Sequence, residues 1–125
     1  MPTFSDYLRD EVNNKVLRNV DFSITGGCYV SLHDGAPGRD GSNEKTGGSY
    51  ARQTGTFAAS SDGTGTSTHA IVFTLMPSGT ISHAGLWNAL SGGDFLIGDA
   101  LSVSKIVNEG DTFQFDAGDL SMYLD

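Results

Sequence analysis

The stretch TISHAGLWNALSGGDFLIGDALSV, residues 80–103, decides the fold. Residues 80–89 and 94–103 both have the composition of strands, and LSGG at residues 90–93 separates them. Gly92 and Gly93 supply the backbone freedom that a hairpin loop needs. The stretch therefore predicts an antiparallel β-hairpin, against which the other segments can be arranged.

Several further segments are typical of strands. In CYVSLH, the apolar Cys28, Val30 and Leu32 alternate with polar positions, which predicts a half-buried strand. Other predicted strands are SYARQTGTFAA (49–59, interrupted at Gly55), THAIVFTLM (68–76), SKIV (104–107), TFQF (112–115) and LSMYL (120–124), with a polar turn region at SSDGTGTST (60–68). Seven or eight short strands at this spacing predict a mainly β protein, an antiparallel β-sandwich or jelly-roll-like domain. A parallel fold is excluded because no helical pattern follows residue 20.

The first twenty residues have a different period. Apolar residues recur every four positions at Phe4, Leu8, Val12, Val16 and Val20, with Tyr7 and Leu17 beside them. This period predicts one amphipathic helix from about Ser5 to Arg18, with Thr3 and Asp6 as a weak capping box. Its apolar stripe must be buried against the sheet or against another chain. We expect a single compact domain, with the N-terminal helix in residues 1–20 and the β-sandwich in residues 21–125.

Composition narrows the classes of partner. Seven Lys and Arg residues against fifteen Asp and Glu residues give a formal net charge of −8. Nucleic-acid binders need basic patches, so nucleic acid is not an expected partner. The sequence has neither an apolar run of the roughly 20 residues that span a membrane nor a secretory signal, so no membrane association is expected. The single cysteine excludes an intramolecular disulfide and favours cytoplasmic assembly.

The loop HDGAPGRDGSNEKTGGSYAR, residues 33–52, is the most polar part of the chain. An EF-hand that started at Asp34 would need oxygen ligands at Ala36 and Gly38, so that pattern fails. A different calcium site, built from Asp34, Asp40 and Glu44, stays open as an alternative. Because glycine-rich segments lose much entropy when they are ordered, we expect residues 34–48 to form a mobile or partner-ordered contact arm.

No pattern of catalytic residues emerges. The three histidines (His33, His69 and His83) occupy different predicted strands without zinc-motif spacing. The sequence has no G-x-S-x-G elbow, and Cys28 fits a small buried apolar residue. The fifteen acidic residues leave many carboxylate pairings, so a hydrolase acting on cell-surface glycan stays open as an alternative. We expect no enzyme, no cofactor and no metal.

Four segments occur in an order that resembles a known family: MPTFSDYL (1–8), GGSYARQ (47–53), ISHAGLWNALSGGDFLIGDAL (81–101) and VNEGDTFQFDAGDL (107–120). Together they are similar to small virion proteins of tailed bacteriophages, described as tail-fibre components or as capsid cement (decoration) proteins. Residues 34–46 depart most from that pattern. The resemblance implies a non-enzymatic structural protein of the virion, assembled in the bacterial cytoplasm, and it carries over no catalytic residue.

Two roles follow from the resemblance. The first expectation is a capsid cement protein that binds the head shell, with the major capsid protein and copies of itself, as a homo-oligomer, for partners. The alternative is a tail-fibre or receptor-binding component whose loop contacts the host surface. In either role, the residues predicted to form the interface are Phe4, Tyr7, Leu8, Arg39, Asp40, Glu44 and Trp87.

Overall fold

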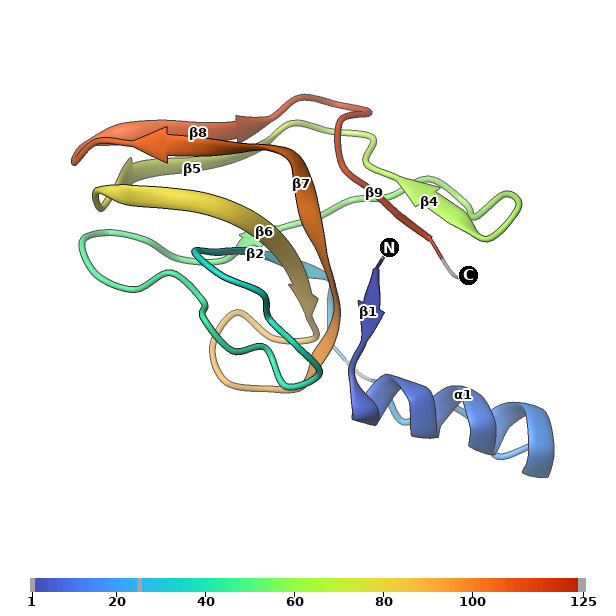
Figure 1. The fold of residues 1–125 in the computed structure, drawn as a ribbon. Coiled ribbons are helices and arrows are strands. Elements are labelled where there is room, and N and C mark those ends of the chain that lie inside the picture. The colour runs from blue at the N-terminus through green and yellow to red at the C-terminus, as the bar shows by residue number, and fades with distance from the viewer. Residues whose placement is uncertain (1, 25, 124–125) are drawn as a thin grey trace.

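The computed structural model describes residues 2–24 and 26–123, which form two β-layers and an N-terminal helix (Figure 1). The elements are β1 (Thr3–Phe4), α1 (Asp6–Arg18), β2 (Tyr29–His33), β3 (Gln53–Thr54), β4 (Thr64–Thr66), β5 (Ile71–Met76), β6 (Gly79–Trp87), β7 (Phe95–Val107), β8 (Asp111–Phe115) and β9 (Ser121–Tyr123). One layer is a five-stranded antiparallel sheet with the order β1-β7-β6-β2-β3. The pair β5-β8 forms the facing layer, and β4-β9 is a third, separate pair.

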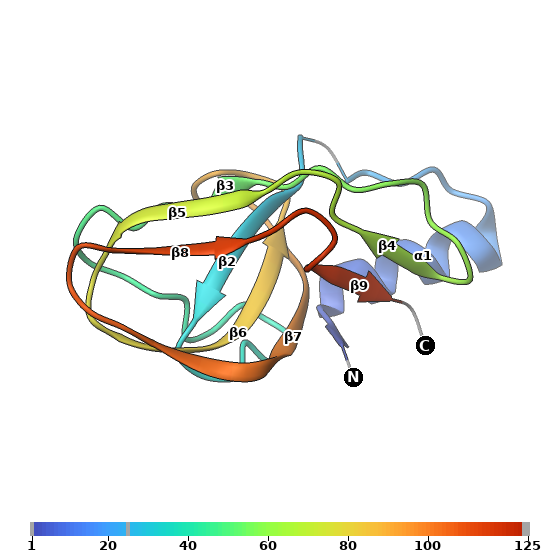
Figure 2. The same cartoon turned by 90° about the horizontal axis from the view of Figure 1, so that it is seen from above.

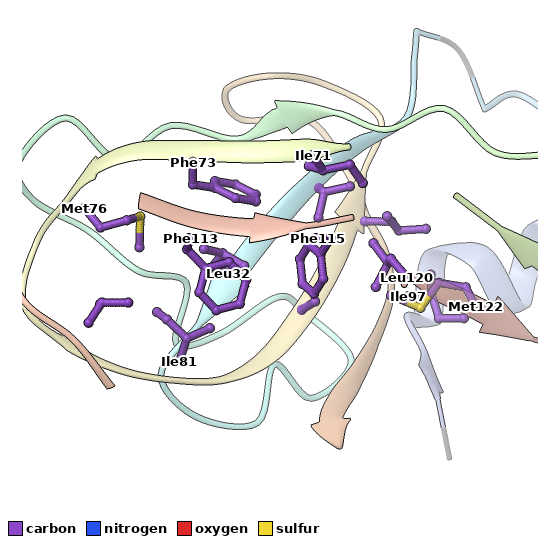
Figure 3. Packing of buried hydrophobic residues seen from close by; sticks show 14 residues of the cluster. Leu32, Ile71, Phe73, Met76, Ile81, Ile97, Phe113, Phe115, Leu120 and Met122 are labelled. Atoms are coloured by element: carbon purple, nitrogen blue, oxygen red, sulfur yellow. The ribbon is translucent and has the colours of Figure 1, made fainter. Parts of the chain in front are cut away.

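The core lies between these layers. Seen from above, β5 and β8 cross β2 and β6 of the larger sheet (Figure 2). Leu32 and Ile81 from the larger sheet face Phe73 and Phe113 from the smaller one (Figure 3). The rings of Phe73 and Phe113 meet edge to face, with centroids 6.3 Å apart, a favourable geometry for aromatic pairs. The predicted mainly β sandwich is confirmed, whereas the more specific jelly roll stays a prediction.

The predicted hairpin is confirmed. Strands β6 and β7 pair antiparallel from Trp87↔Phe95 to Gly79↔Val107. Residues 104–107, predicted as a separate strand, instead continue β7. The register breaks between two partner pairs, Ile81↔Lys105 and His83↔Ala100. Residues 101–104 of β7 therefore lie opposite Ser82 alone, which is a large, irregular bulge in the middle of the longest strand.

Strand β2 is buried on both faces, so the prediction of a half-buried strand is wrong. Ser31 and His33, expected at the surface, are 0% exposed. The cover is the glycine-rich loop: Pro37 lies against Gly98 of β7, and Gly41 lies against the Trp87 ring. Alternation indicates which residues share a face, but it does not reveal that a distant loop covers the other face.

Residues 34–45 of the predicted mobile or partner-ordered contact arm (34–48) are held by hydrogen bonds within the chain, and a role in contacting a partner stays a prediction. The amides of Gly41 and Ser42 both donate to the carbonyl of Pro37, and the amide of Asp34 donates to the carbonyl of Asn43. The amide of Lys45 donates to Leu32 of β2 at 2.8 Å. Residues 34–45 are thus folded onto the sheet by hydrogen bonds of their own backbone.

The helix is confirmed over Asp6–Arg18, but its predicted cap is wrong. Ser5, not Thr3, is the N-cap, and its hydroxyl accepts a 3.0 Å hydrogen bond from the Leu8 amide. Thr3 belongs to β1, which pairs with β7. The C-cap Asn19 has a left-handed backbone with φ of 52°, a conformation that asparagine tolerates well.

Two other segments differ from expectation. Residues 49–59 contain only the two-residue strand Gln53–Thr54, and the predicted polar turn region contains β4. Strand β4 exists because β9 pairs with it, with Gly65 opposite Met122. That pairing joins segments far apart in the sequence, so no local pattern indicates it.

Candidate functional site

Arg52 is the centre of a buried polar network that joins three segments of the chain. Its Nε and Nη2 donate to the two carboxylate oxygens of Glu44 at 2.9 and 2.8 Å. Its Nη1 donates to the carbonyls of Ala89 and Gly92 at 2.9 and 2.8 Å. The guanidinium also lies 3.7 Å from the centroid of the Trp87 ring. This two-pronged ion pair is the strong form of the interaction, and it ties the 34–48 loop to the 88–94 hairpin loop.

Tyr50 supports the same carboxylate. Its hydroxyl donates to Glu44 at 2.9 Å and accepts from the Leu32 amide at 3.0 Å. Its ring stacks on Phe73, with centroids 6.1 Å apart. Burial raises the pKa of Tyr50 well above its ordinary value, so the hydroxyl stays protonated and donates. The SYAR segment therefore places two side chains, from Tyr50 and Arg52, on one acidic partner.

A second chain of hydrogen bonds runs through His33. Trp87 Nε1 donates to Ser31 Oγ at 3.0 Å, the Ser31 hydroxyl donates to His33 Nε2 at 2.7 Å, and His33 Nδ1 donates to the Ser42 carbonyl at 2.9 Å. We assign this tautomer because the carbonyl accepts only. Burial is the main cause that lowers the pKa of His33, so the ring is neutral at pH 7. Through its two hydrogen bonds, the His33 ring connects β2 to the loop.

The buried groups are committed to one another. Among the described residues, no buried side-chain nitrogen or oxygen lacks a hydrogen-bond partner. The described chain also has no cluster of three His, Cys, Asp or Glu residues suited to a metal ion. The calcium alternative fails on its ligands, because Glu44 is occupied by Arg52 and Asp40 bonds to Ser42. The network holds the two loops together, and we call it the Arg52 clamp.

Cys28 is less buried than expected, although it packs against the core. Burial raises the pKa of its thiol to about 11. At neutral pH the group is therefore a thiol, whereas nucleophilic cysteines act as thiolates.

The N-terminal arm, defined as residues 2–24, is attached to the sandwich at its base. Phe4 pairs with Ile97 of β7 and packs against the core. The Ser5 amide donates to the carbonyl of Leu96 at 2.9 Å. From this base, α1 runs away from the two sheets (Figure 1).

The far end of the arm exposes apolar side chains, and no residue of α1 is buried. We call these the arm tip: Val16 (74% exposed), Leu17 (77%), Val20 (43%) and Phe22 (50%). The segment after the helix folds back along it, because Glu11 accepts hydrogen bonds from the amide and hydroxyl of Ser23. The stripe was predicted to be buried against the sheet or against another chain. The sheet does not bury this half of the helix, so burial against another chain stays a prediction.

The residues predicted as an interface fall in three places: the buried network (Glu44 and Trp87), the surface of the loop (Arg39 and Asp40) and the base of the arm (Phe4, Tyr7 and Leu8). Arg39 reaches Asp6 at 3.4 Å, so the loop and the arm are adjacent. Glu44 and Trp87 are not brought together with the others. The prediction that this set forms an interface stays a prediction.

The interface prediction did not include Leu17 and Phe22 of the arm tip. Leu17 lies outside the four-residue stripe, and Phe22 follows the helix. Only their hydrophobicity next to charged neighbours could have indicated a contact role.

A groove of about 500 Å³ lies between the bulged part of β7 and the segment from β8 to β9. Apolar side chains line it from both sides, and Asp99, Lys105 and Asp119 add charge; the apolar lining includes Leu101, Val103, Phe113, Phe115, Leu120 and Met122. Val103 is 78% exposed. Among the described strands, none pairs with residues 101–107 on the edge of β7 that β1 uses at Ile97 and Gly98.

Comparisons with known proteins complete the description. A family model described as podophage GP4 fiber I protein gp80 matches residues 3–123. No curated protein matches the chain. Among the described residues, no helix is both long and apolar enough to cross a membrane.

Proposed function

This chain belongs to the podophage GP4 fiber I protein gp80 family, and we propose that it is a non-enzymatic subunit of a phage fibre. Its family makes it a structural protein of a tailed-phage virion. In our proposal the β-sandwich is the rigid body of the subunit, and the arm attaches this body to its neighbours. The family description favours the tail-fibre alternative over capsid cement, the first expectation from the sequence.

The observation that carries this proposal is the exposed arm tip. Val16 and Leu17 are 74% and 77% exposed at the far end of a projecting helix. Burying one such side chain contributes about 1.5–3 kcal/mol, so the lone chain leaves this stabilisation unused. Contiguous exposed apolar residues mark contact surfaces, and a fibre subunit needs one to be held in the particle.

A second surface suits contact with the host. Residues 44–48, 50–52 and 90–92 line a shallow depression of about 390 Å³ that includes Arg52. Leu90 on its rim is 57% exposed. Because Arg52 already fixes both loops, a ligand that binds there would not have to order them, and preorganisation of this kind favours affinity.

The location in the particle tests the proposal. We would label the β-sandwich with an antibody in purified virions, locate it by electron microscopy and count copies by quantitative mass spectrometry. A fibre subunit gives few copies, placed at the fibres. Many copies spread over the head shell, bound to the major capsid protein, would instead establish the capsid cement role.

A matched pair of variants tests the arm. Leu17→Asp alters an exposed arm-tip residue, and Leu90→Asp alters an exposed residue of the hairpin loop. We expect Leu17→Asp to be lost from particles while Leu90→Asp is incorporated normally. Incorporation of Leu17→Asp at the wild-type copy number would contradict attachment through the arm tip.

A further inference from the structure

We propose that the arm tip of one copy binds in the β7 groove of a second copy, so that the chain assembles with itself head to tail. This inference deepens the proposed function, because it names both the partner of the arm and the surface that receives it. It rests on three features: the arm tip is exposed among the described residues, the groove is apolar and adjacent to the base of the arm, and Asp119 in the groove is an acidic counterpart for Arg18 of the arm.

The described residues of the sandwich leave the arm tip exposed. The arm is attached to the sandwich at its base, through Phe4 and Ser5, and Asp6 also pairs with Arg39 of the loop. Beyond that base the helix runs away from the five-stranded sheet and the β5-β8 pair, on the side of the molecule where β4 and β9 lie (Figure 1). The 77% exposure of Leu17 follows from this placement, and in our proposal a second copy covers it.

The groove has the chemistry to take an amphipathic helix. Leu101 and Phe115 line opposite walls, and Leu120 lies among them. A helix that binds in such a groove inserts side chains from one face, as recurring helix-in-groove complexes do. The groove also continues an existing contact: β1 pairs with β7 at Gly98, and the lining begins at Asp99. The edge of β7 that holds the base of an arm thus leads directly to the place proposed for the tip of another.

Charge distinguishes this arrangement from a pairing of two arm tips. Arg18 adjoins Leu17, and its guanidinium donates a 3.4 Å hydrogen bond to Asn14. Two paired tips would bring the Arg18 side chains of both copies close together, which is unfavourable. The lining of the groove carries the carboxylate of Asp119 as well as the ammonium group of Lys105, and Asp119 is the acidic partner that we propose for Arg18.

The arrangement determines the symmetry of the assembly. Tip and groove are different surfaces, so the contact is heterologous, and each copy can bind one neighbour on either side. Such contacts close into a ring or extend into a filament. This symmetry can be recognised by mixing a variant of the tip with a variant of the groove, because a two-fold contact would give a different result.

The test uses the purified full chain, with mass measured by light scattering after gel filtration. We expect the wild type to be larger than a monomer, and Leu17→Asp and Val103→Asp each to be monomeric. Both residues are more than three-quarters exposed, at 77% and 78%, so the variants should fold. Mixed together, they retain one intact tip and one intact groove and should form a dimer that grows no further. The control Leu90→Asp should assemble like the wild type.

Other results would overturn the inference. A monomeric wild type excludes self-assembly. If Val103→Asp still assembles, the tips bind each other; if Leu17→Asp still assembles, the grooves do. Absence of the dimer in the mixture excludes a heterologous contact. A monomeric wild type that is nevertheless found in fibres leaves the proposed function intact and assigns the arm to a different fibre protein.

Charge reversal tests the specific orientation. Arg18→Glu and Asp119→Arg should each weaken assembly about tenfold, because an attraction is lost and a repulsion is gained. The double variant should regain wild-type assembly. A double variant weaker than either single one would contradict the pairing of Arg18 with Asp119.

Discussion

The loop of residues 34–45 and the C-terminal half of α1 have opposite relations between sequence and packing. The loop is rich in glycine and charge, yet it covers β2 so fully that His33 is 0% exposed. The helix is regular and amphipathic, yet none of its residues is buried. Regular secondary structure therefore does not imply tertiary packing. Integration into the fold depends on specific partners, which the loop has and the arm tip lacks.

Among the proposed substitutions, a change at Arg52 should weaken the packing of the loop most. Arg52→Met removes the cation between Glu44 and the two loop carbonyls, and it leaves a carboxylate that is 20% exposed without its partner. We expect a loss of about 3–5 kcal/mol in the free energy of unfolding, the usual cost of breaking a buried ion pair. Urea denaturation measures it.

The control for that prediction is Arg52→Met combined with Glu44→Gln. The double variant should recover part of the loss, because no unpaired charge remains. Wild-type stability in the single variant would mean that Arg52 does not hold the loops.

One methyl group added at Gly41 should also push the loop away from the Trp87 ring. In Gly41→Ala the new Cβ would lie 2.5 Å from the Trp87 ring, at a φ of +81°. Overpacking costs about 1–3 kcal/mol, in addition to the cost of a left-handed backbone. Gly110→Ala has a similar φ of +87° but open space around it, so the difference between the two free energies of unfolding isolates the ring contact. Equal values would show that the loop does not press on Trp87.

His33 provides a smaller, pH-dependent test. Because burial lowers its pKa in the folded state, the unfolded chain binds a proton more readily below the ordinary value of about 6.5. Stability should therefore fall as the pH drops through that region, by at most about 1.4 kcal/mol per pH unit for this group. Unfolding measured between neutral and mildly acidic pH should show a flatter profile in His33→Gln than in the wild type. A His33→Gln profile as steep as the wild type would contradict the assignment.

The smallest effect on folding is expected at the arm tip. Leu17→Asp should change the stability of the monomer by less than about 0.5 kcal/mol, as surface substitutions usually do. Leu8→Asp, at a half-buried position near the base, should cost more. Thermal unfolding of the two variants compares both ends of the same helix, and a larger loss in Leu17→Asp would mean that the tip is packed.

Local patterns predicted the β6–β7 hairpin, the helix and the sandwich, because period and turn residues are properties of neighbouring positions. They could not predict the clamp, whose members Glu44, Arg52 and Gly92 come together only in the fold. The sequence did not predict the groove, because residues 104–107 were predicted as a strand of their own and not as part of β7. The helical stripe indicated that α1 needs a contact, but a period carries no information about which molecule provides it.

The most direct test of the account is amide hydrogen exchange followed by mass spectrometry, on the wild type in its assembled state and on monomeric Leu17→Asp. We predict that residues 34–45 exchange slowly in both, while residues 16–22 and 101–106 are protected only in the assembly. Fast exchange of the loop in both proteins, or equal protection of the arm tip in the monomer, would contradict it.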